Sequence, residues 1–412
     1  MSAEQNAYLP WFLHVCRGGL VALCLTGTAT GGDRTGPVLP QIVKAPAQKP
    51  AELTVMVYMN GKNDLMWLAR RDLAEIQSAS PSRKVSVVAE AGITGQGVKR
   101  YRFGGSAAFG EVSAPQLIMD LGPGDMGDWR SLASFGKWAK HNYPAKRYIL
   151  IIWNHGSGWT KSAGAFMAEK GISYDYETGR HFSTPQLADA LREMGKVDIL
   201  AMDACLMQMA EVAWEIGAYA EVMVASEEIM QGDGFPYDRM LDGFSKDPAA
   251  STEALAKIMV DQFGRYYKNA GKVSTLSALR TGALPGLLAR LNAWTGAALR
   301  EDPAKLAAAA QASKAYDTPE NKDLYDFLGR VALSLSDSGE LREKSASLRA
   351  YIRSDLIIAN AATGKQGPDS SSGGIAVFLP LREGYSGGYA ELSWARDSAW
   401  DEFLERLPKT PR

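Results

Sequence analysis

Residues 148–158 read YILIIWNHGSG, an apolar run that ends in a polar, glycine-rich turn containing His155. Residues 148–153 have the length and composition of a buried strand. Residues 197–205, VDILAMDAC, repeat the arrangement, with an apolar run followed at once by Asp203 and Cys205. Strands that are apolar nearly throughout are typical of a parallel sheet covered by helices on both faces.

Other segments between residues 52 and 245 fit the same alternation of strands and helices. Apolar runs predict strands over residues 54–59, 84–89 and 221–225, and helical spacing predicts helices over 132–140 and 206–219. Asp64 is suited to cap a helix that begins near residue 65. The predicted fold class is α/β, with a mostly parallel sheet between two layers of helices.

The length of 412 residues indicates more than one ordinary domain. We expect a leader over residues 1–30, a Pro/Gly-rich tether over 31–51, a catalytic domain over 52–245 and a mainly helical region over 246–412. A late strand at residues 374–379 is expected to complete the fold. Within the helical region, helices are predicted over residues 251–269, 284–300, 303–316, 324–336 and 341–362, and a strand over 272–280.

The N-terminal stretch indicates export. Residues 8–28 contain an apolar run that Arg17 and two glycines interrupt, so it is too short to span a membrane but resembles a secretory signal. Residues 20–24, LVALC, resemble a lipoprotein signal, although Leu23 stands where a small residue is normal. We therefore expect an extracytoplasmic protein, with a lipid anchor at Cys24 left open.

Composition and motifs exclude several classes of function. A net charge of −1 provides no basic field for nucleic acid, so no nucleic-acid partner is expected. The chain has no P-loop, no dinucleotide-binding glycine motif and no HExxH motif. Four histidines without a cysteine cluster make a structural zinc site improbable. Function must come from a local site, with no metal or cofactor required.

Cys205 and His155 suit nucleophilic catalysis. In parallel sheets, ligands bind beyond the C-terminal ends of the strands, and both residues follow such ends. Cys205 is predicted at a helix N-terminus, which would favour its thiolate, and His155 can exchange protons with it. The amides of Gly156 and Cys205 can bind an oxyanion. The alternatives are a small buried core cysteine and a histidine that closes a turn.

Two motifs, NHGSGW at residues 154–159 and DACLM at 203–207, resemble the signature blocks of the clostripain family of cysteine peptidases. The likeness extends over residues 53–406, and the spacing of 50 residues between His155 and Cys205 is that of caspase-type peptidases. Further matching segments are TVMVYMN at 54–60 with Asp64, DMGD at 125–128, ASEEIMQGDGFPY at 225–237, DLYDF at 323–327, GIAVFLP at 374–380 and WDEFL at 400–404.

The resemblance implies a caspase-like α/β/α fold and a Cys205–His155 dyad that hydrolyses proteins or peptides after Arg or Lys. A desolvated guanidinium needs a carboxylate partner, and the family match assigns that role to Asp203 and Asp233. From the residues alone, Asp203 is equally suited to cap the helix expected after it. Asp233, between two glycines, is equally suited to a turn.

Some relatives are zymogens that cut themselves between the histidine and cysteine blocks, and here Lys170 or Arg180 is the expected processing site. Calcium dependence also occurs in the family, but the sequence has no EF-hand-type loop, which leaves calcium open. Two alternatives to an endopeptidase remain. One is a cysteine-dependent transpeptidase using the same acyl-enzyme, and the other is a catalytically silent binding module of the same fold.

Overall fold

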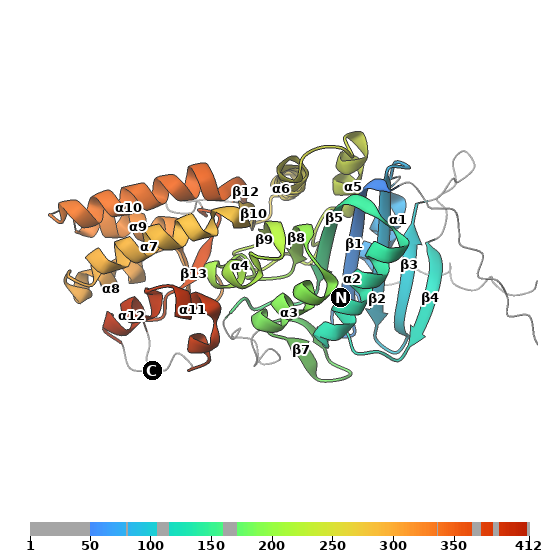
Figure 1. The fold of residues 1–412 in the computed structure, drawn as a ribbon, viewed down its shortest axis with the longest axis horizontal. Helices are drawn as coiled ribbons and strands as arrows, with labels where there is room; N and C mark the ends of the chain where they lie inside the picture. The colour runs from blue at the N-terminus through green and yellow to red at the C-terminus, as the bar shows by residue number, and fades with distance from the viewer. Residues whose placement is uncertain are drawn as a thin grey trace, which may run out of the picture. The chain divides into compact units, whose positions relative to one another are not determined.

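One central sheet of nine strands has the order β12-β10-β9-β8-β5-β1-β2-β3-β4 (Figure 1). The structure is a computed structural model, and it describes residues 50–79, 81–104, 115–159, 171–335, 337–364, 372–381 and 387–409. The strands of this sheet are β1 (Ala51–Gly61), β2 (Val85–Ile93), β3 (Gly97–Phe103), β4 (Gln116–Gly122), β5 (Ala145–Trp153), β8 (Val197–Asp203), β9 (Ala220–Ala225), β10 (Ser274–Arg280) and β12 (Ile357–Thr363).

The centre of the sheet is parallel and its edges are antiparallel. Strands β2, β1, β5, β8 and β9 pair in parallel. Strands β3 and β4 extend one edge, and β10 and β12 extend the other, all by antiparallel pairing. The parallel strands are the apolar runs of the sequence, so the predicted α/β class with a mostly parallel sheet is confirmed.

Helices cover both faces of the sheet. One face packs against α1 (Met66–Ser78), α5 (Tyr237–Lys246) and α6 (Thr252–Ala270), through alternate strand residues such as Val57 and Ile151. The other face packs against α2 (Trp129–Asn142), α3 (Thr184–Met194) and α4 (Ala210–Ile216), through the intervening residues. Residues that alternate along a strand point to opposite faces, so each parallel strand contributes to both cores.

The C-terminal part of the chain extends the sheet and adds helices beyond its β12 edge. Figure 1 shows α7, α8, α9 and α10 gathered beyond β10 and β12. These helices and the last two are α7 (Leu284–Ala298), α8 (Pro303–Ala312), α9 (Leu324–Ser334), α10 (Gly339–Tyr351), α11 (Ser393–Asp397) and α12 (Trp400–Arg406). Two small sheets pair β6 (Ile172–Asp175) with β7 (Arg180–Phe182) and β11 (Asn321–Asp323) with β13 (Ala376–Phe378).

Two predicted helices are wrong in extent. The helix expected over residues 206–219 begins only at Ala210 and ends at Ile216. The helix expected over residues 341–362 ends as α10 at Tyr351 and passes through a short π-helical turn into strand β12. In both places contacts with distant residues replace the helix that local spacing favours.

The leader and the anchor site at Cys24 lie outside the described residues, and so does the tether apart from its last two residues. Within the part of the chain that the structure describes, no helix has both the length and the apolar character needed to cross a bilayer.

Candidate active site

His155 and Cys205 follow the ends of two adjacent strands at the C-terminal edge of the sheet. Strands β5 and β8 are parallel, with Trp153 opposite Asp203, and each candidate residue follows its strand end by two positions. Gly156 packs closely against the Cys205 backbone. A Cβ at position 156 would lie only 2.7 Å from the Cys205 carbonyl oxygen. The structure thus places Gly156 against the Cys205 backbone, and it places His155 and Cys205 beyond adjacent strand ends.

Cys205 itself lies in a loop and not at a helix N-terminus, because α4 starts five residues later at Ala210. Its sulfur accepts a hydrogen bond from the Met230 amide at 3.3 Å. Burial raises the pKa of the Cys205 thiol to about 11, and the hydrogen bond from Met230 only partly opposes this shift. The expectation of an acidified thiol is therefore wrong for this structure, because the helix terminus that was to acidify it is absent.

Backbone strain is concentrated around the two candidate residues. Leu206 (φ 62°) and Ser173 (φ 65°) are the non-glycine residues with positive φ in the described chain. Leu206 directly follows Cys205, and the Ser173 amide donates to the His155 carbonyl at 3.3 Å. Left-handed backbone costs a non-glycine residue on the order of 1–2 kcal/mol, and such strain clusters at functional sites.

Asp64 contacts His155, although the sequence suggested a helix cap. The N-cap of α1 is Leu65, which makes no side-chain capping bond. Asp64 Oδ1 lies 2.9 Å from His155 Nε2, and Tyr176 stacks on the imidazole with ring centroids 6.2 Å apart. A carboxylate at Nε2 holds the proton on that nitrogen and presents Nδ1 for proton exchange. Asp64 and Tyr176 are site residues that the sequence reasoning missed.

The loop carrying His155 is held by strand β6. The Ser157 amide donates to the Gly171 carbonyl at 3.0 Å, and the Tyr174 amide donates to Asn154 Oδ1 at 2.7 Å. The Asn154 side chain in turn donates to the Asn60 carbonyl at the end of β1. The position of His155 therefore depends on β6, which begins immediately after the segment that contains Lys170.

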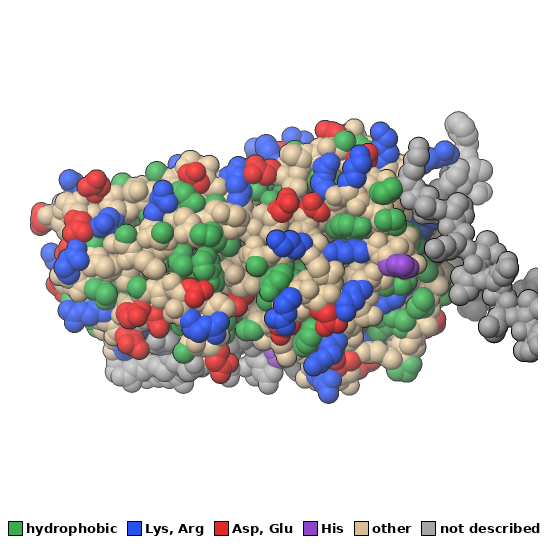
Figure 2. All heavy atoms as spheres, viewed as in Figure 1, with side chains coloured by type: hydrophobic (Ala, Val, Ile, Leu, Met, Phe, Trp, Pro, Cys, Tyr) green, Lys and Arg blue, Asp and Glu red, His purple; other side chains and the backbone are tan. Residues whose placement is uncertain are grey.

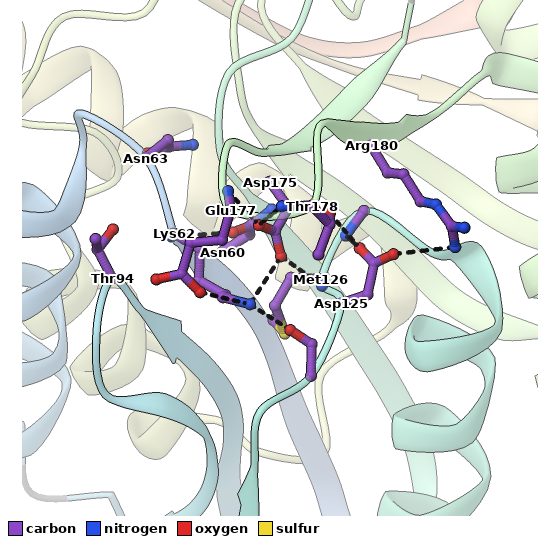
Figure 3. Close-up of polar contacts among 12 residues, drawn as sticks. Asn60, Lys62, Asn63, Thr94, Asp125, Met126, Asp175, Glu177, Thr178 and Arg180 are labelled. Carbon is purple, nitrogen blue, oxygen red and sulfur yellow. Dashed lines mark hydrogen bonds and ion pairs between the residues drawn. The ribbon is translucent and has the colours of Figure 1, made fainter.

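A buried charge cluster fixes β6 to the end of β1 (Figure 3). Lys62 Nζ lies 3.1 Å from Asp175 Oδ2 and 2.9 Å from Glu177 Oε2, and it also donates to the Gly124 carbonyl. Asp175 is fully buried and accepts from the amides of Met126 and Glu177 at 2.9 Å each. Hydrogen bonds and ion pairs with the two carboxylates raise the pKa of Lys62 in spite of its burial, so the ammonium stays charged.

Replacing Lys62 with methionine is expected to lower the free energy of unfolding by about 3–5 kcal/mol, because it leaves the Asp175 carboxylate buried without a cation. Urea denaturation measures the change. Lys99→Met is the control, since its partner Asp120 is 3.7 Å away and half exposed, and we expect a loss of less than about 1 kcal/mol. Equal effects of the two variants would show that the cluster around Lys62 adds no special stability.

The two predicted specificity carboxylates lie close together on the face covered by α1 and α5. Asp203 Oδ2 accepts from the Phe235 amide at 3.0 Å and from the Tyr237 hydroxyl at 3.1 Å, so the helix-cap interpretation of Asp203 is wrong. Burial, with the charge of Asp72 adding to it, raises the pKa of Asp203 to about 7. The neighbouring Gly234 would place a Cβ 2.9 Å from Asp203 Oδ2.

Asp233 is partly exposed and paired with two cations. Arg71 Nη1 lies 3.1 Å from its Oδ1, and Lys272 Nζ lies 2.5 Å from its Oδ2. The hydrogen bond from Lys272 is the main cause that lowers the pKa of Asp233. Asp233 also lies in a turn, closed by the Gly234 amide donating to the Gln231 carbonyl at 2.8 Å. Arg71 and Lys272 had no place in the sequence-based site.

Two further predictions concern the processing sites and a metal ion. Lys170 lies outside the described residues, whereas Arg180 lies on β7 and pairs with Asp125 at 3.3 Å. Among the described residues, no group of three or more Asp, Glu, His or Cys side chains is arranged to hold a metal ion.

Comparison with known proteins identifies the family. A model of the clostripain family matches residues 57–406. Clostripain of Hathewaya histolytica is 32% identical over 154 residues, which are 35% of this chain and only 28% of that protein. The chain therefore matches less than a third of the length of this relative.

Solved structures share the fold. An inactive zymogen C11 protease from Parabacteroides distasonis has a TM-score of 0.64 at 19% identity, covering 85% of this chain and 98% of its own. A secreted C11 cysteine protease from Bacteroides thetaiotaomicron, bound to an irreversible peptide inhibitor, has a TM-score of 0.67 at 18% identity, covering 85% and 100%. The caspase-like α/β/α expectation is confirmed, and the chain belongs to the clostripain family of cysteine peptidases.

Proposed function

We propose that this protein is an endopeptidase that cleaves after Arg or Lys through an acyl-enzyme on Cys205. The observation that carries the proposal is the pairing of β5 with β8, which sets His155 and Cys205 at equal distances beyond adjacent strand ends. A buried carboxylate, Asp203, lies two residues before the nucleophile. Nucleophile, proton carrier and anionic group thus lie within a few residues of one edge of the sheet.

In the proposed reaction, His155 takes the thiol proton as the Cys205 sulfur attacks the scissile carbonyl carbon. We assign the amides of Gly156 and Cys205 to the oxyanion. The hydrogen bonds between the His155 loop and β6 are donated by two other amides, those of Ser157 and Ser173. His155 then gives its proton to the leaving amine, and water attacks the thioester to release the acid and regenerate the thiol. Because the thiol pKa is raised in this structure, the thiolate forms only as His155 accepts the proton.

Asp64→Asn is expected to lower kcat about 10-fold to 100-fold and leave KM nearly unchanged, because the amide no longer stabilises the imidazolium. Asp64 is exposed, so no loss of stability is expected. Circular dichroism of the variant distinguishes a positioning role from simple misfolding. An unchanged kcat would exclude Asp64 from the mechanism.

The substrates are proposed to be proteins or peptides, with no cofactor. Acidic and basic side chains are interspersed over the face of the molecule in Figure 2, and the net charge is −1, which supports a peptide rather than a nucleic-acid partner. We propose that Asp203 pairs with the cationic side chain of the substrate and that Asp233 lies on the outer side of that side chain.

The test is hydrolysis of fluorogenic peptides that differ only in the residue before the cut: Arg, Lys, Asp, Asn or Ala. Turnover after Arg or Lys supports the proposal. Turnover confined to the peptides with Asp or Asn before the cut would support a peptidase but overturn the proposed specificity for Arg or Lys. Added amine nucleophiles separate hydrolysis from transpeptidation, because a transpeptidase yields mainly the amide product. No turnover, with or without calcium or limited proteolysis, would favour the silent binding module.

We also propose export and processing. The signal-like residues 8–28 and the tether support an extracytoplasmic location, with catalytic residues 52–245 buttressed by residues 246–412.

Lys170 is favoured over Arg180 as the processing site. Cleavage after Lys170 leaves β6 and β7 together on one fragment, whereas cleavage after Arg180 divides β7 after its first residue. Intact mass of the active enzyme tests this, since an active uncut chain excludes processing.

A further inference from the structure

The face of the sheet under α1 and α5 carries a ring of charged side chains beside Cys205. Asp203 lies opposite Trp153 on the adjacent strand, and Trp153 Nε1 donates to Asp72 Oδ2 at 2.8 Å. Arg71 then joins two carboxylates. Its Nε and Nη2 lie 3.0 and 2.9 Å from Asp72 Oδ1, and its Nη1 lies 3.1 Å from Asp233 Oδ1.

The turn that holds Asp233 closes the ring. Arg71 Nη2 also donates to the Gly232 carbonyl at 2.7 Å. The next residue after Asp233 is Gly234, which packs on the Asp203 carboxylate and continues to the Phe235 amide that donates to it. Asp203 and Asp233 are therefore neighbours in one network, but their partners differ.

The difference lies in the charge of those partners. Both oxygens of Asp233 face cations of the protein itself, Arg71 at Oδ1 and Lys272 at Oδ2. Asp203 accepts from an amide and a hydroxyl, both of which are neutral. A basic substrate side chain that approaches Asp233 therefore meets a carboxylate already compensated twice, and it meets like charge from Arg71 and Lys272.

We propose that Lys272 and Arg71 are specificity-determining residues that compete with the substrate's basic side chain for Asp233. This inference rests on the proposed cleavage after Arg or Lys. It predicts that the pocket binds basic side chains less tightly than the carboxylates of Asp72, Asp203 and Asp233 alone would allow. The two competing cations would then set the ratio of kcat/KM for basic substrates to kcat/KM for neutral substrates. Lys272 is the exchangeable one, because Arg71, although equally exposed, is also tied to the buried Asp72.

A purely structural ring is the alternative. Arg71 belongs to α1, Asp233 to the turn before α5, and Lys272 to the segment before β10, so the ion pairs also connect three elements. A structural role predicts that removing Lys272 changes stability but leaves the choice of substrate unaltered. Competition predicts a change that is confined to cationic substrates.

The test is Lys272→Gln, assayed on matched peptides with Arg or Ala before the cut. We expect kcat/KM for the arginyl peptide to rise about threefold to fivefold, the scale of one exposed ion pair, with no change for the alanyl peptide. Lys137→Gln is the matched control. It removes one positive charge from an exposed pair between Lys137 on α2 and Glu193 on α3, and it should leave both peptides unchanged.

A double-mutant cycle assigns the effect to Asp233. If Lys272 acts through that carboxylate, Lys272→Gln should give no gain in an Asp233→Asn background. A gain that persists there, an equal gain on the alanyl peptide, or no gain at all would overturn the proposal.

A binding measurement keeps the inference separate from the proposed function. In Cys205→Ala protein, agmatine supplies a free guanidinium, and calorimetry should show threefold to fivefold tighter binding after Lys272→Gln is added. If the wild-type enzyme fails to cleave after Arg or Lys, the proposed specificity falls. Tighter agmatine binding in the double variant would then still uphold the competition, whereas unchanged binding would refute it.

Discussion

Replacing Cys205 with alanine is expected to lower kcat for an arginyl peptide by on the order of 10⁵-fold, because no acyl-enzyme can form without the thiol. The fold should survive this change. The thiol's hydrogen bond is a single contact from the Met230 amide at 3.3 Å, and alanine fits in the space that the sulfur leaves. The measurement is single-turnover hydrolysis of a fluorogenic peptide, with circular dichroism to verify the fold.

His155→Gln, compared with His141→Gln, completes that experiment. His141 is exposed in the last turn of α2, so its replacement should leave activity unchanged. Alkylation adds a second readout, because Cys205 is the free cysteine of the described residues and its labelling should track the loss of activity. Residual activity above about one-thousandth of wild type in Cys205→Ala would point to a different nucleophile.

The strand ends that hold His155 and Cys205 could be predicted because they depend on local composition. Residues 148–153 and 199–202 are apolar without a charged residue, and only a doubly covered parallel sheet buries both sides of such strands. The rule that sites lie beyond parallel strand ends then placed both residues at one edge. The register of β5 against β8 refines this by bringing Trp153 level with Asp203.

The loop after Cys205 could not be predicted, because distant residues determine it. Residues 206–216 have helical spacing, yet no helix forms before Ala210. The Gln208 amide donates to the Ser226 carbonyl at 3.0 Å, and its side chain donates to Ser277 Oγ at 2.7 Å. These partners lie on or beside β9 and β10, and satisfying a buried Gln outweighs the propensity of this stretch for helix.

The end of β1 shows a signal that was present but unused. The run Asn60–Asp64 follows a parallel strand next to β5, the same position that singled out His155 and Cys205. From its sequence this run suggests only a helix cap at Asp64. In the structure Lys62 anchors β6, Asn63 donates to the Tyr174 carbonyl at 2.8 Å and Asp64 contacts His155. Applying the strand-end rule to every parallel strand would have found them.

Asp203→Asn is expected to lower kcat/KM for an arginyl peptide by about 10²-fold to 10³-fold, because a desolvated guanidinium loses its carboxylate partner. The alanyl peptide should change by less than about threefold. Asparagine keeps the carbonyl oxygen that the Phe235 amide and the Tyr237 hydroxyl need, so folding is expected to persist. Asp233→Asn is the comparison, and its effect should be smaller, since Arg71 and Lys272 already compensate that carboxylate.

The pH dependence provides an independent measurement of the same carboxylate. Burial raises the pKa of Asp203 to about 7, so the group is mostly neutral at pH 6 and mostly charged at pH 8. The ratio of arginyl to alanyl kcat/KM should therefore rise across this interval in the wild-type enzyme and stay flat in Asp203→Asn. Dividing by the alanyl rate removes the pH dependence of the chemical step, which both substrates share. A ratio that is flat in the wild type would show that Asp203 does not meet the substrate cation.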